Sequence, residues 1–307
     1  MKRTPRNLAL IAIALLSLFA CKKKSTTTTT TDTPPSAAAY AKLMDDGYNS
    51  LLQTATFDAS NSSYTYTSPK GTTVMIDGTC LRKNGVAVTG LVKLEFYEAY
   101  ERKDMIVANK PTMGKTSGGT YELLESGGQY YVGVSQDGIA LTTTCNVLIS
   151  TPASNSGGVK TGMSAFDGVM TDNGLTWEPA TKWEVIPDVR KAKYDLNVPG
   201  FGWYNCDRFY NDARPKTSLT LNVPAGYANV SSVFILAKSM PNSLGAAYGK
   251  WPIGLECYLI FVTEKDGEYR WITKETTLVN GHTESFDLAK AQTGKRHDYV
   301  GHVTLLK

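Results

Sequence analysis

The sequence predicts a mainly β protein, with two β-sandwich-like domains after a lipoprotein signal peptide, a disordered tether and a short N-terminal helix. Three observations lead to this fold class. An apolar run near the N terminus ends at a cysteine, a threonine-rich segment follows it, and from residue 63 onward hydrophobic residues recur with a period of two between glycine turns. The 307 residues, of which 42% are hydrophobic, suffice for one or two domains with sizeable cores.

The charge balance excludes one class of partner. Lys and Arg number 32 against 28 acids, but six of these cations lie in the first 24 residues, which leaves 26 against 28 beyond. The body is therefore nearly neutral and lacks the basic stripe that nucleic-acid binding needs. No nucleic-acid partner and no cofactor are expected.

Residues 1–20 are predicted to be a lipoprotein signal peptide. Three basic residues precede an apolar run from Leu8 to Leu16, and Leu18-Phe19-Ala20-Cys21 resembles the lipobox of bacterial lipoproteins, whose cysteine is lipidated after cleavage. The apolar stretch is too short to span a bilayer comfortably as a helix. The alternatives are an ordinary signal peptide with a chance cysteine and a short retained anchor.

Residues 21–37 are expected to form the lipidated Cys21 and a flexible tether. Three lysines, a run of six threonines and two prolines cannot bury a core. Extended, this segment would reach roughly 50 Å from the membrane. The lysines would add electrostatic attraction to an anionic membrane surface.

Residues 38–62 are expected to hold a short helix and a connection. Tyr40, Met44 and Tyr48 recur every four residues, which places them on one helical face. Gly47 lies inside this stretch and weakens the prediction, because glycine disfavours a helix interior.

A first β-sandwich domain is predicted at residues 63–162. Val92, Leu94 and Phe96 alternate with more polar residues, as in a half-buried strand. Turns are predicted at four dipeptides, which are Asn84-Gly85, Gly118-Gly119, Gly127-Gly128 and Asp137-Gly138. The Ser-, Gly- and Thr-rich stretch at 151–162 is either a domain boundary or a long crossing loop.

Residues 163–307 are predicted to be a second β-rich domain. Its clearest element is a hairpin that joins 255–264 to 268–279 across Lys265-Asp266-Gly267. The end of the chain, from Tyr299 to Leu306, alternates again and is expected to be a strand that closes a sheet. One long composite sandwich is the alternative to two unlike domains.

Four cysteines beyond Cys21 allow disulfides in an exported chain. Pairing Cys80 with Cys145 and Cys206 with Cys257 keeps each bond inside one predicted domain, and the first two share an inward-facing parity. Four buried free thiols are the alternative. No metal site is predicted, because the sequence has no Cys-x-x-Cys pair and its three histidines share no ligand spacing.

The segment from Gly200 to Tyr210 concentrates aromatic and charged residues. It could form a ligand platform in which aromatic rings stack on a sugar and polar groups hydrogen-bond to it. The residues concerned are Trp203, Tyr204, Asn205, Asp207 and Arg208. The sequence favours the other interpretation, a tight bend whose aromatic residues pack in the core.

No catalytic residues are predicted. Gly162-Met163-Ser164-Ala165-Phe166 has phenylalanine where a nucleophile elbow needs its second glycine. Carboxylate pairs of the kind that hydrolyse glycosides come from distant strands and leave no local pattern to detect.

The chain resembles a recurrent type of uncharacterised envelope lipoprotein of Bacteroidota across most of residues 70 to 307. The resemblance lies in Cys21 with its lysines, Val88-Thr89-Gly90 before Val92 to Glu98, Leu124-Glu125-Ser126-Gly127-Gly128 before Tyr130 to Val134, and Gly202 to Phe209. The first β region is also similar to carboxypeptidase-regulatory-like, Ig-like sandwich modules. The resemblance implies a β-sandwich lipoprotein without an established enzyme activity.

These observations predict a lipid-anchored cell-envelope protein, non-enzymatic, that binds a protein, peptidoglycan or glycan through a sandwich surface. The alternatives are an envelope hydrolase with carboxylates from different strands and a purely structural spacer. Surface-exported relatives often carry acids just after the lipidated cysteine. Because lysines stand there in this chain, an outer-membrane lipoprotein that faces the periplasm is expected.

Overall fold

The structure, a computed structural model, describes residues 32–306. The predicted signal peptide and the lipidation site Cys21 lie outside these residues. Strands hold 48% of the chain and helices 14%, which confirms the mainly β class. Within the described part, no helix is both long and apolar enough to cross a membrane.

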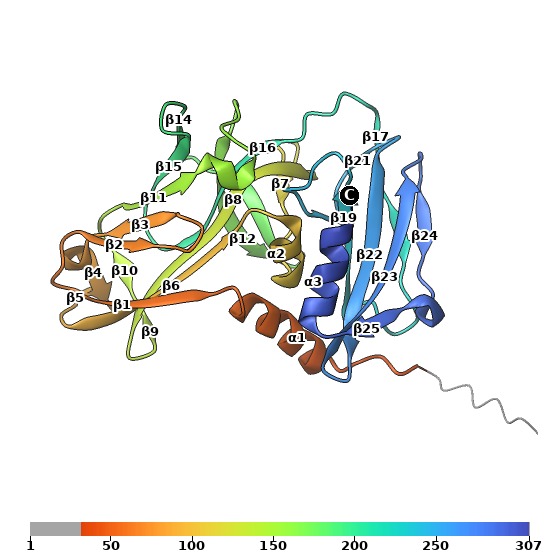
Figure 1. The fold of residues 1–307 in the computed structure, drawn as a ribbon, viewed down its shortest axis with the longest axis horizontal. Helices are drawn as coiled ribbons and strands as arrows, with labels where there is room; N and C mark the ends of the chain where they lie inside the picture. Colours follow the sequence, from red (N-terminus) through yellow and green to blue (C-terminus); the bar gives the residue numbers. More distant parts are fainter. Residues whose placement is uncertain (1–31, 307) are drawn as a thin grey trace, which may run out of the picture. The chain divides into compact units, whose positions relative to one another are not determined.

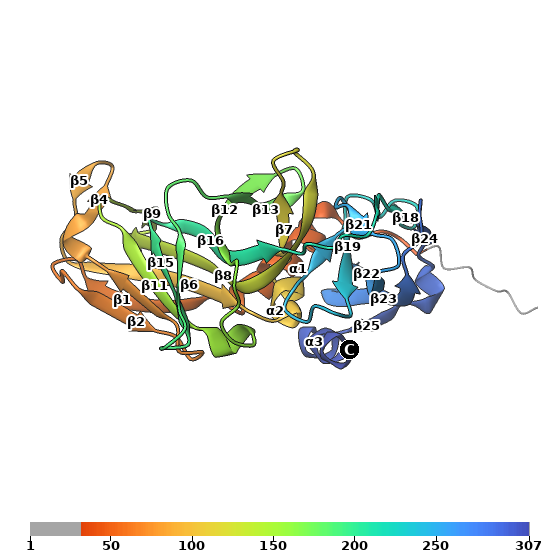
Figure 2. The same ribbon diagram turned by 90° about the horizontal axis from the view of Figure 1, so that it is seen from above.

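The first region is a β-sandwich (Figures 1 and 2). Its larger sheet has the strand order β1 (Gln53–Asp58), β6 (Leu91–Ala99), β8 (Tyr121–Gln136), β16 (Gly202–Phe209), β12 (Ser164–Thr171), β13 (Gly174–Pro179) and β7 (Met113–Lys115), with β9 (Ile139–Ala140) on β8. Its smaller sheet has the order β14 (Val185–Asp188), β15 (Lys193–Val198), β11 (Val147–Pro152), β3 (Thr73–Ile76) and β2 (Tyr64–Thr67). All pairs in both sheets are antiparallel except β13 with β7.

The two sheets of the sandwich share one hydrophobic core. Leu94 and Phe96 of β6 and Val132 of β8 are fully buried together with Ile149 of β11 and Leu196 of β15. These residues alternate along their strands with more exposed ones, because successive side chains of a strand face opposite sides. The alternation noted at residues 92–96 therefore marks a true core strand.

A small sheet beside the sandwich carries the disulfide. Its order is β10 (Thr142–Thr143), β4 (Leu81–Lys83) and β5 (Val86–Ala87), and the turn η1 (Gly78–Cys80) leads into it. Cys80 and Cys145 are bonded to each other. The bond closes a loop with a sequence separation of 65 residues, which ties the start of the sandwich to its middle.

The sandwich includes strands from both sides of the boundary expected at residue 162. β16 pairs with β8, and β15 pairs with β11. Strand pairing joins residues far apart in the sequence, so the Ser- and Gly-rich stretch, which includes the turn η2 (Ala153–Ser156), is a crossing loop inside this region. The first region thus extends to the end of β16.

The second region is a sheet covered on both faces. Its strand order is β20 (Gly245–Ala246), β19 (Ser231–Ala237), β22 (Glu256–Lys265), β23 (Glu268–Thr277) and β25 (Gln292–Gly294). One face packs against α1 (Ala37–Asn49), α2 (Arg102–Val107) and α3 (Arg296–Leu305), and the other lies against elements that include two small sheets and a turn. These are β17 (Lys216–Thr217) with β21 (Trp251–Pro252), β18 (Thr220–Asn222) with β24 (Thr283–Ser285), and η3 (Leu288–Lys290).

The predicted hairpin of the second region is confirmed. β22 and β23 pair along ten positions across Asp266 and Gly267. Both turn residues have positive φ, 52° and 83°, as a two-residue turn between twisted strands requires.

Two predicted elements are wrong. The end of the chain is the helix α3 and not a strand, because Tyr299 and Val303 are both fully buried at the spacing of one helical face. Gly127-Gly128 is no turn, since β8 runs through it with a shift of register against β16. A Cβ on Gly127 would lie 2.7 Å from the Cys206 carbonyl oxygen, so glycine is needed there for close strand approach.

The predicted N-terminal helix is confirmed as α1. The Ser36 side chain caps it by accepting a hydrogen bond from the Ala39 backbone at 3.1 Å. Leu43 and Met44 are buried against the second sheet. Gly47 is the contact point with α2, where a Cβ would overlap the Val107 carbonyl oxygen. The residue that weakened the prediction is therefore required by packing.

Candidate binding groove

The residues predicted as a ligand platform all lie on β16, and they do not share a surface. Successive side chains on a strand face opposite sides, so Trp203 and Tyr204 diverge. Tyr204 is buried in the sandwich core, where its ring meets Trp183 edge-on with centroids 5.5 Å apart.

Trp203 lies in an aromatic cluster that the chain itself covers. Its ring centroid is 5.7 Å from that of Tyr48 on α1, 5.4 Å from Tyr97 and 5.1 Å from Tyr131. The Lys110 ammonium sits 5.3 Å from the Trp203 ring centroid and 5.4 Å from that of Tyr48, in cation–π contact with both. Burial lowers the pKa of Lys110. We call these residues the Trp203 cluster.

Asn205 and Asp207 are buried within the sheet. The Asn205 amide donates a hydrogen bond of 2.6 Å to the Asp207 carboxyl. Burial raises the pKa of Asp207 well above its usual range, and this outweighs the hydrogen bonds from Ser126, Gly127 and Asn205. Neither side chain is available to a ligand.

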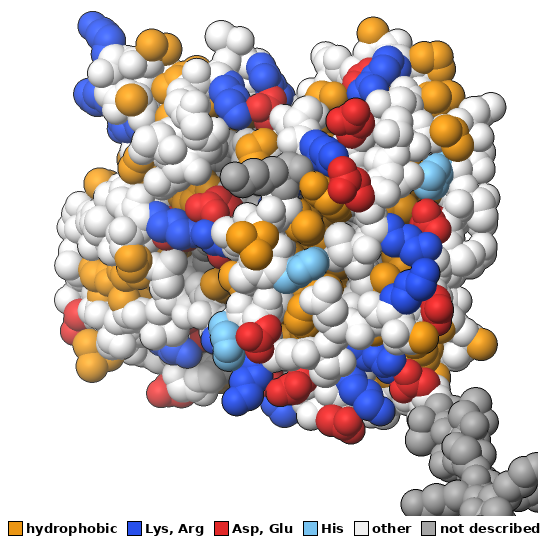
Figure 3. Space-filling model, turned by 45° about the vertical axis from the view of Figure 1, so that its right-hand side comes forward, with side chains coloured by type: hydrophobic (Ala, Val, Ile, Leu, Met, Phe, Trp, Pro, Cys, Tyr) orange, Lys and Arg blue, Asp and Glu red, His pale blue; other side chains and the backbone are white. Residues whose placement is uncertain are grey.

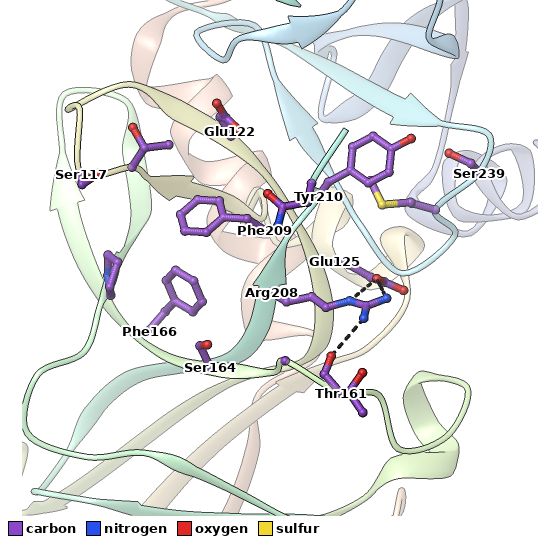
Figure 4. Close-up of a pocket in the computed structure, with 15 residues that line it drawn as sticks. Ser117, Glu122, Glu125, Thr161, Ser164, Phe166, Arg208, Phe209, Tyr210 and Ser239 are labelled. Carbon is purple, nitrogen blue, oxygen red and sulfur yellow. Dashed lines mark hydrogen bonds and ion pairs between the residues drawn. The ribbon is translucent and has the colours of Figure 1, made fainter. Parts of the chain in front are cut away.

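Arg208 is the one predicted residue that lines an open hollow (Figure 4). Its Nε donates to Glu125 Oε2 at 2.7 Å, and its Nη1 donates to the Thr161 carbonyl at 3.0 Å. Lys160 approaches the other oxygen of the same carboxylate at 2.6 Å. Burial opposes ionisation of Glu125, but the hydrogen bonds from Lys160 and Arg208 prevail and lower its pKa.

The hollow beside Arg208 has a volume of about 890 Å³ and mixes aromatic and polar walls. Phe166 and Phe209 meet edge-on with centroids 5.5 Å apart, and the half-buried Tyr210 follows them. Ser164 and Ser239 contribute hydroxyl groups (Figure 4). Rings beside hydroxyls and ion pairs are typical of sites for polar ligands with apolar faces.

Two further hollows extend this site. One of about 330 Å³ shares Glu125 and Ser239 with it, and the next, of about 460 Å³, shares Glu101 and Pro241 with the second. All three follow residues 238–242, which connect β19 to β20. We call them together the groove, and the last one the Arg102 hollow.

The connection that forms one wall of the groove is fixed to the sandwich. The Asn242 amide donates to the Ser126 carbonyl. The Arg102 backbone donates to the Pro241 carbonyl at 3.4 Å, and the Leu244 backbone donates to Thr112 Oγ1 at 2.9 Å. The groove is therefore held by hydrogen bonds in the absence of a ligand, which reduces the entropy that binding must overcome.

The groove carries an excess of positive charge. Its lining includes five cations, which are Arg102, Lys103, Lys160, Arg208 and Lys238, against three acids, which are Glu101, Glu122 and Glu125. On the face shown in Figure 3, by contrast, acidic and basic side chains are intermixed. The groove therefore favours an acidic ligand.

The second expected disulfide is not formed. Cys206 on β16 and Cys257 on β22 are free thiols in the cores of different regions. Burial raises the pKa of Cys206 well above its usual range and that of Cys257 to about 12. Both thiols are buried hydrophobic residues and poor nucleophiles.

One cluster of metal-ligand residue types occurs in the described part of the chain. The ligand atoms of Asp77, Cys80 and Cys145 lie within 4.8 Å of one another. The two sulfurs are bonded to each other, so they are not the thiolates that a metal requires. The histidines lie elsewhere: His302, for example, bonds Thr273 at 2.7 Å.

Most groove residues have no signal in the sequence. Arg102, Lys160 and Lys238 come from a helix, a loop and a connection that are far apart in the chain. Glu125 was noted only within the Leu124 to Gly128 motif of the family resemblance. Only pairing of β8 with β16 brings Glu125 next to Arg208.

Comparison with models of protein families, with curated proteins and with solved structures returns no match for this chain. The function is therefore argued from the groove itself.

Proposed function

We propose that this chain is a lipid-anchored, non-enzymatic cell-envelope protein that binds peptidoglycan along the groove. The observation that carries the proposal is the continuity of three hollows with an excess of cations and an aromatic wall. Peptidoglycan combines sugar rings, which stack on aromatic side chains, with peptide carboxylates, which pair with Lys and Arg. An extended groove also suits a polymer better than a small molecule.

The predicted address supports this partner. Lipidation of Cys21 would hold the protein at the outer membrane, and lysines after the cysteine favour the periplasmic face. A tether of residues 21–37 with a reach of roughly 50 Å would let the body stand away from the membrane surface. The body could then meet the cell wall while remaining anchored.

A hydrolase with two carboxylates is the alternative, and the groove acids favour binding over it. Glu122 and Glu125 both come from β8 and not from different strands. Glu122 pairs with Lys216, and Glu125 pairs with Lys160 and Arg208. A general acid needs a raised pKa, whereas the pKa of Glu125 is lowered.

Co-sedimentation of the purified full chain with isolated peptidoglycan tests the proposal. We expect saturable binding that weakens with salt, because exposed charge pairs are screened. Arg208→Gln and Lys160→Gln should each weaken binding about tenfold, the effect of losing a charge-assisted hydrogen bond. Lys193→Gln is the matched control, since Lys193 also pairs with an acid, Asp195, but lies outside the groove.

Three outcomes would contradict the proposal. The chain could fail to sediment with peptidoglycan, the groove variants could bind as well as the control, or a neutral glycan could bind equally well. The last result would remove the role of the ligand carboxylates.

A further inference from the structure

We propose that the Arg102 hollow is a subsite for the terminal carboxylate of a peptide whose last residue is small and apolar. This deepens the proposed function, because it names the part of the polymer that one end of the groove would hold. The inference starts from the ion-pair state of one buried cation.

Arg102 is a buried guanidinium without an acidic partner. It is 8% exposed, and its side chain donates only to carbonyl groups, those of Ala237 and Leu306. No carboxylate within residues 32–306 forms an ion pair with it. Burial lowers the pKa of Arg102. A buried charge is normally paired, so this one has capacity for an external anion.

The chemistry of the hollow indicates which anion. The planar guanidinium matches a carboxylate, which it can bind through two parallel hydrogen bonds. Lys103 and Lys238 flank it, and each pairs with a half-exposed or exposed acid, Glu101 and Glu275 respectively. A carboxylate here would meet three cations.

The walls of the hollow limit what accompanies the carboxylate. Pro241, Val303 and Leu306 provide apolar surface beside the cations. A volume of about 460 Å³ holds the end of a peptide with a small side chain, but no sugar chain. Because Glu101 and Pro241 also line the neighbouring hollow, the preceding residues of a peptide would continue toward Glu125 and Arg208.

Calorimetric titration of the full chain tests this assignment. The probes are acetyl-Ala-Ala with a free carboxylate, the same peptide with a C-terminal amide, and inorganic phosphate. We expect the free acid to bind at least about tenfold more tightly than the amide, since the amide loses the charge-assisted hydrogen bonds. Phosphate should compete only weakly, because it lacks the apolar part.

Two variants locate the binding. Arg102→Gln should abolish the preference for the free acid. Thr304→Trp should block the hollow without touching the Arg102 hydrogen bonds, because Thr304 is exposed at its rim. Leu305→Trp is the matched control, since Leu305 is 78% exposed on the same helix and lines none of the three hollows.

Equal affinity for acid and amide would overturn the inference, as would free-acid binding that survives both variants. Thr304→Trp decides the matter if Arg102→Gln fails to fold. Peptidoglycan binding that persists while the free acid shows no preference would refute the subsite alone. Loss of all peptidoglycan binding in the parent chain would refute the proposed function.

Discussion

The Trp203 cluster and the hollow beside Arg208 lie five residues apart on β16, and both combine aromatic rings with a cation. In the cluster, α1 covers the rings, and Lys110 stacks between Tyr48 and Trp203. In the hollow, Phe209, Tyr210 and Arg208 line open space. The same residue types thus stabilise the fold in one place and remain available to a ligand in the other.

The difference teaches that a covering element decides the role of such residues. The apolar face of α1 needs a surface to bury, and the sheet offers it the face that carries Trp203. The opposite end of β16 meets the fixed connection at 238–242, which leaves a gap beside Arg208. Changes in the cluster should therefore reduce stability, and changes in the groove should reduce binding.

Trp203→Ala should have the largest effect, a loss of about 3 kcal/mol in the free energy of unfolding, as expected for removing a large aromatic side chain from a packed site. The measurement is denaturant unfolding followed by fluorescence. Below the unfolding transition, the variant should bind peptidoglycan like the parent. Trp203→Phe is the control and should lose less, since it keeps a ring. A stable Trp203→Ala chain with impaired binding would contradict the contrast between the two sites.

Gly47→Ala should come next, with a loss of about 2 kcal/mol, because the added methyl group overlaps the Val107 carbonyl oxygen and pushes α1 off α2. Thermal unfolding measures it. Gly301→Ala in α3 is the matched control: a Cβ there meets no atom within 4 Å, so helix propensity should make this change neutral or stabilising. If both changes had the same effect, α1 would not be held by this contact.

The fold was largely predictable because its local signals are strong. Alternation at Val92, Leu94 and Phe96 and the Asp266-Gly267 turn follow from strand geometry and turn chemistry alone. The errors occur where tertiary packing overrides local pattern. The strand predicted at Tyr299 to Leu306 is a helix since the sheet face needs a cover, and Gly127-Gly128 stays in β8 since β16 approaches closely.

The candidate site was mostly unpredictable. Arg208 was identified because it lies in an unusual segment, yet Trp203 and Tyr204 beside it point into packed surroundings. The groove depends on residues 238–242 being fixed against the sandwich, which is a long-range contact without a sequence pattern. Charge alone does not help, because ion pairs on the outer surface use the same residue types.

Glu125→Gln should sharpen the groove side of the comparison. The Glu125 carboxylate occupies Lys160 and Arg208, so removing its charge frees both cations and should strengthen binding of an acidic ligand about threefold to tenfold. Its lowered pKa means that ionised Glu125 stabilises the folded chain above about pH 4.5 and that this contribution is lost as pH falls through the lowered value. The variant should therefore be less stable at neutral pH, by a margin that shrinks in acid. Weaker peptidoglycan binding would show that Glu125 itself contacts the ligand.

Asp207→Asn should have the smallest effect, and of the opposite sign. Because the pKa of Asp207 is raised, the folded chain keeps its proton after the unfolded chain has lost it near pH 3.8, so stability falls as pH rises from there toward the raised pKa. The amide keeps the size of the carboxyl group and an oxygen to accept from Asn205, without a charge to bury. The variant should gain on the order of 1 kcal/mol at neutral pH, and the gain should vanish near pH 3.8. The same change at the exposed Asp172 should leave the unfolding free energy nearly unchanged, and a variant less stable than the parent at neutral pH would mean that Asp207 is ionised and paired in the folded chain.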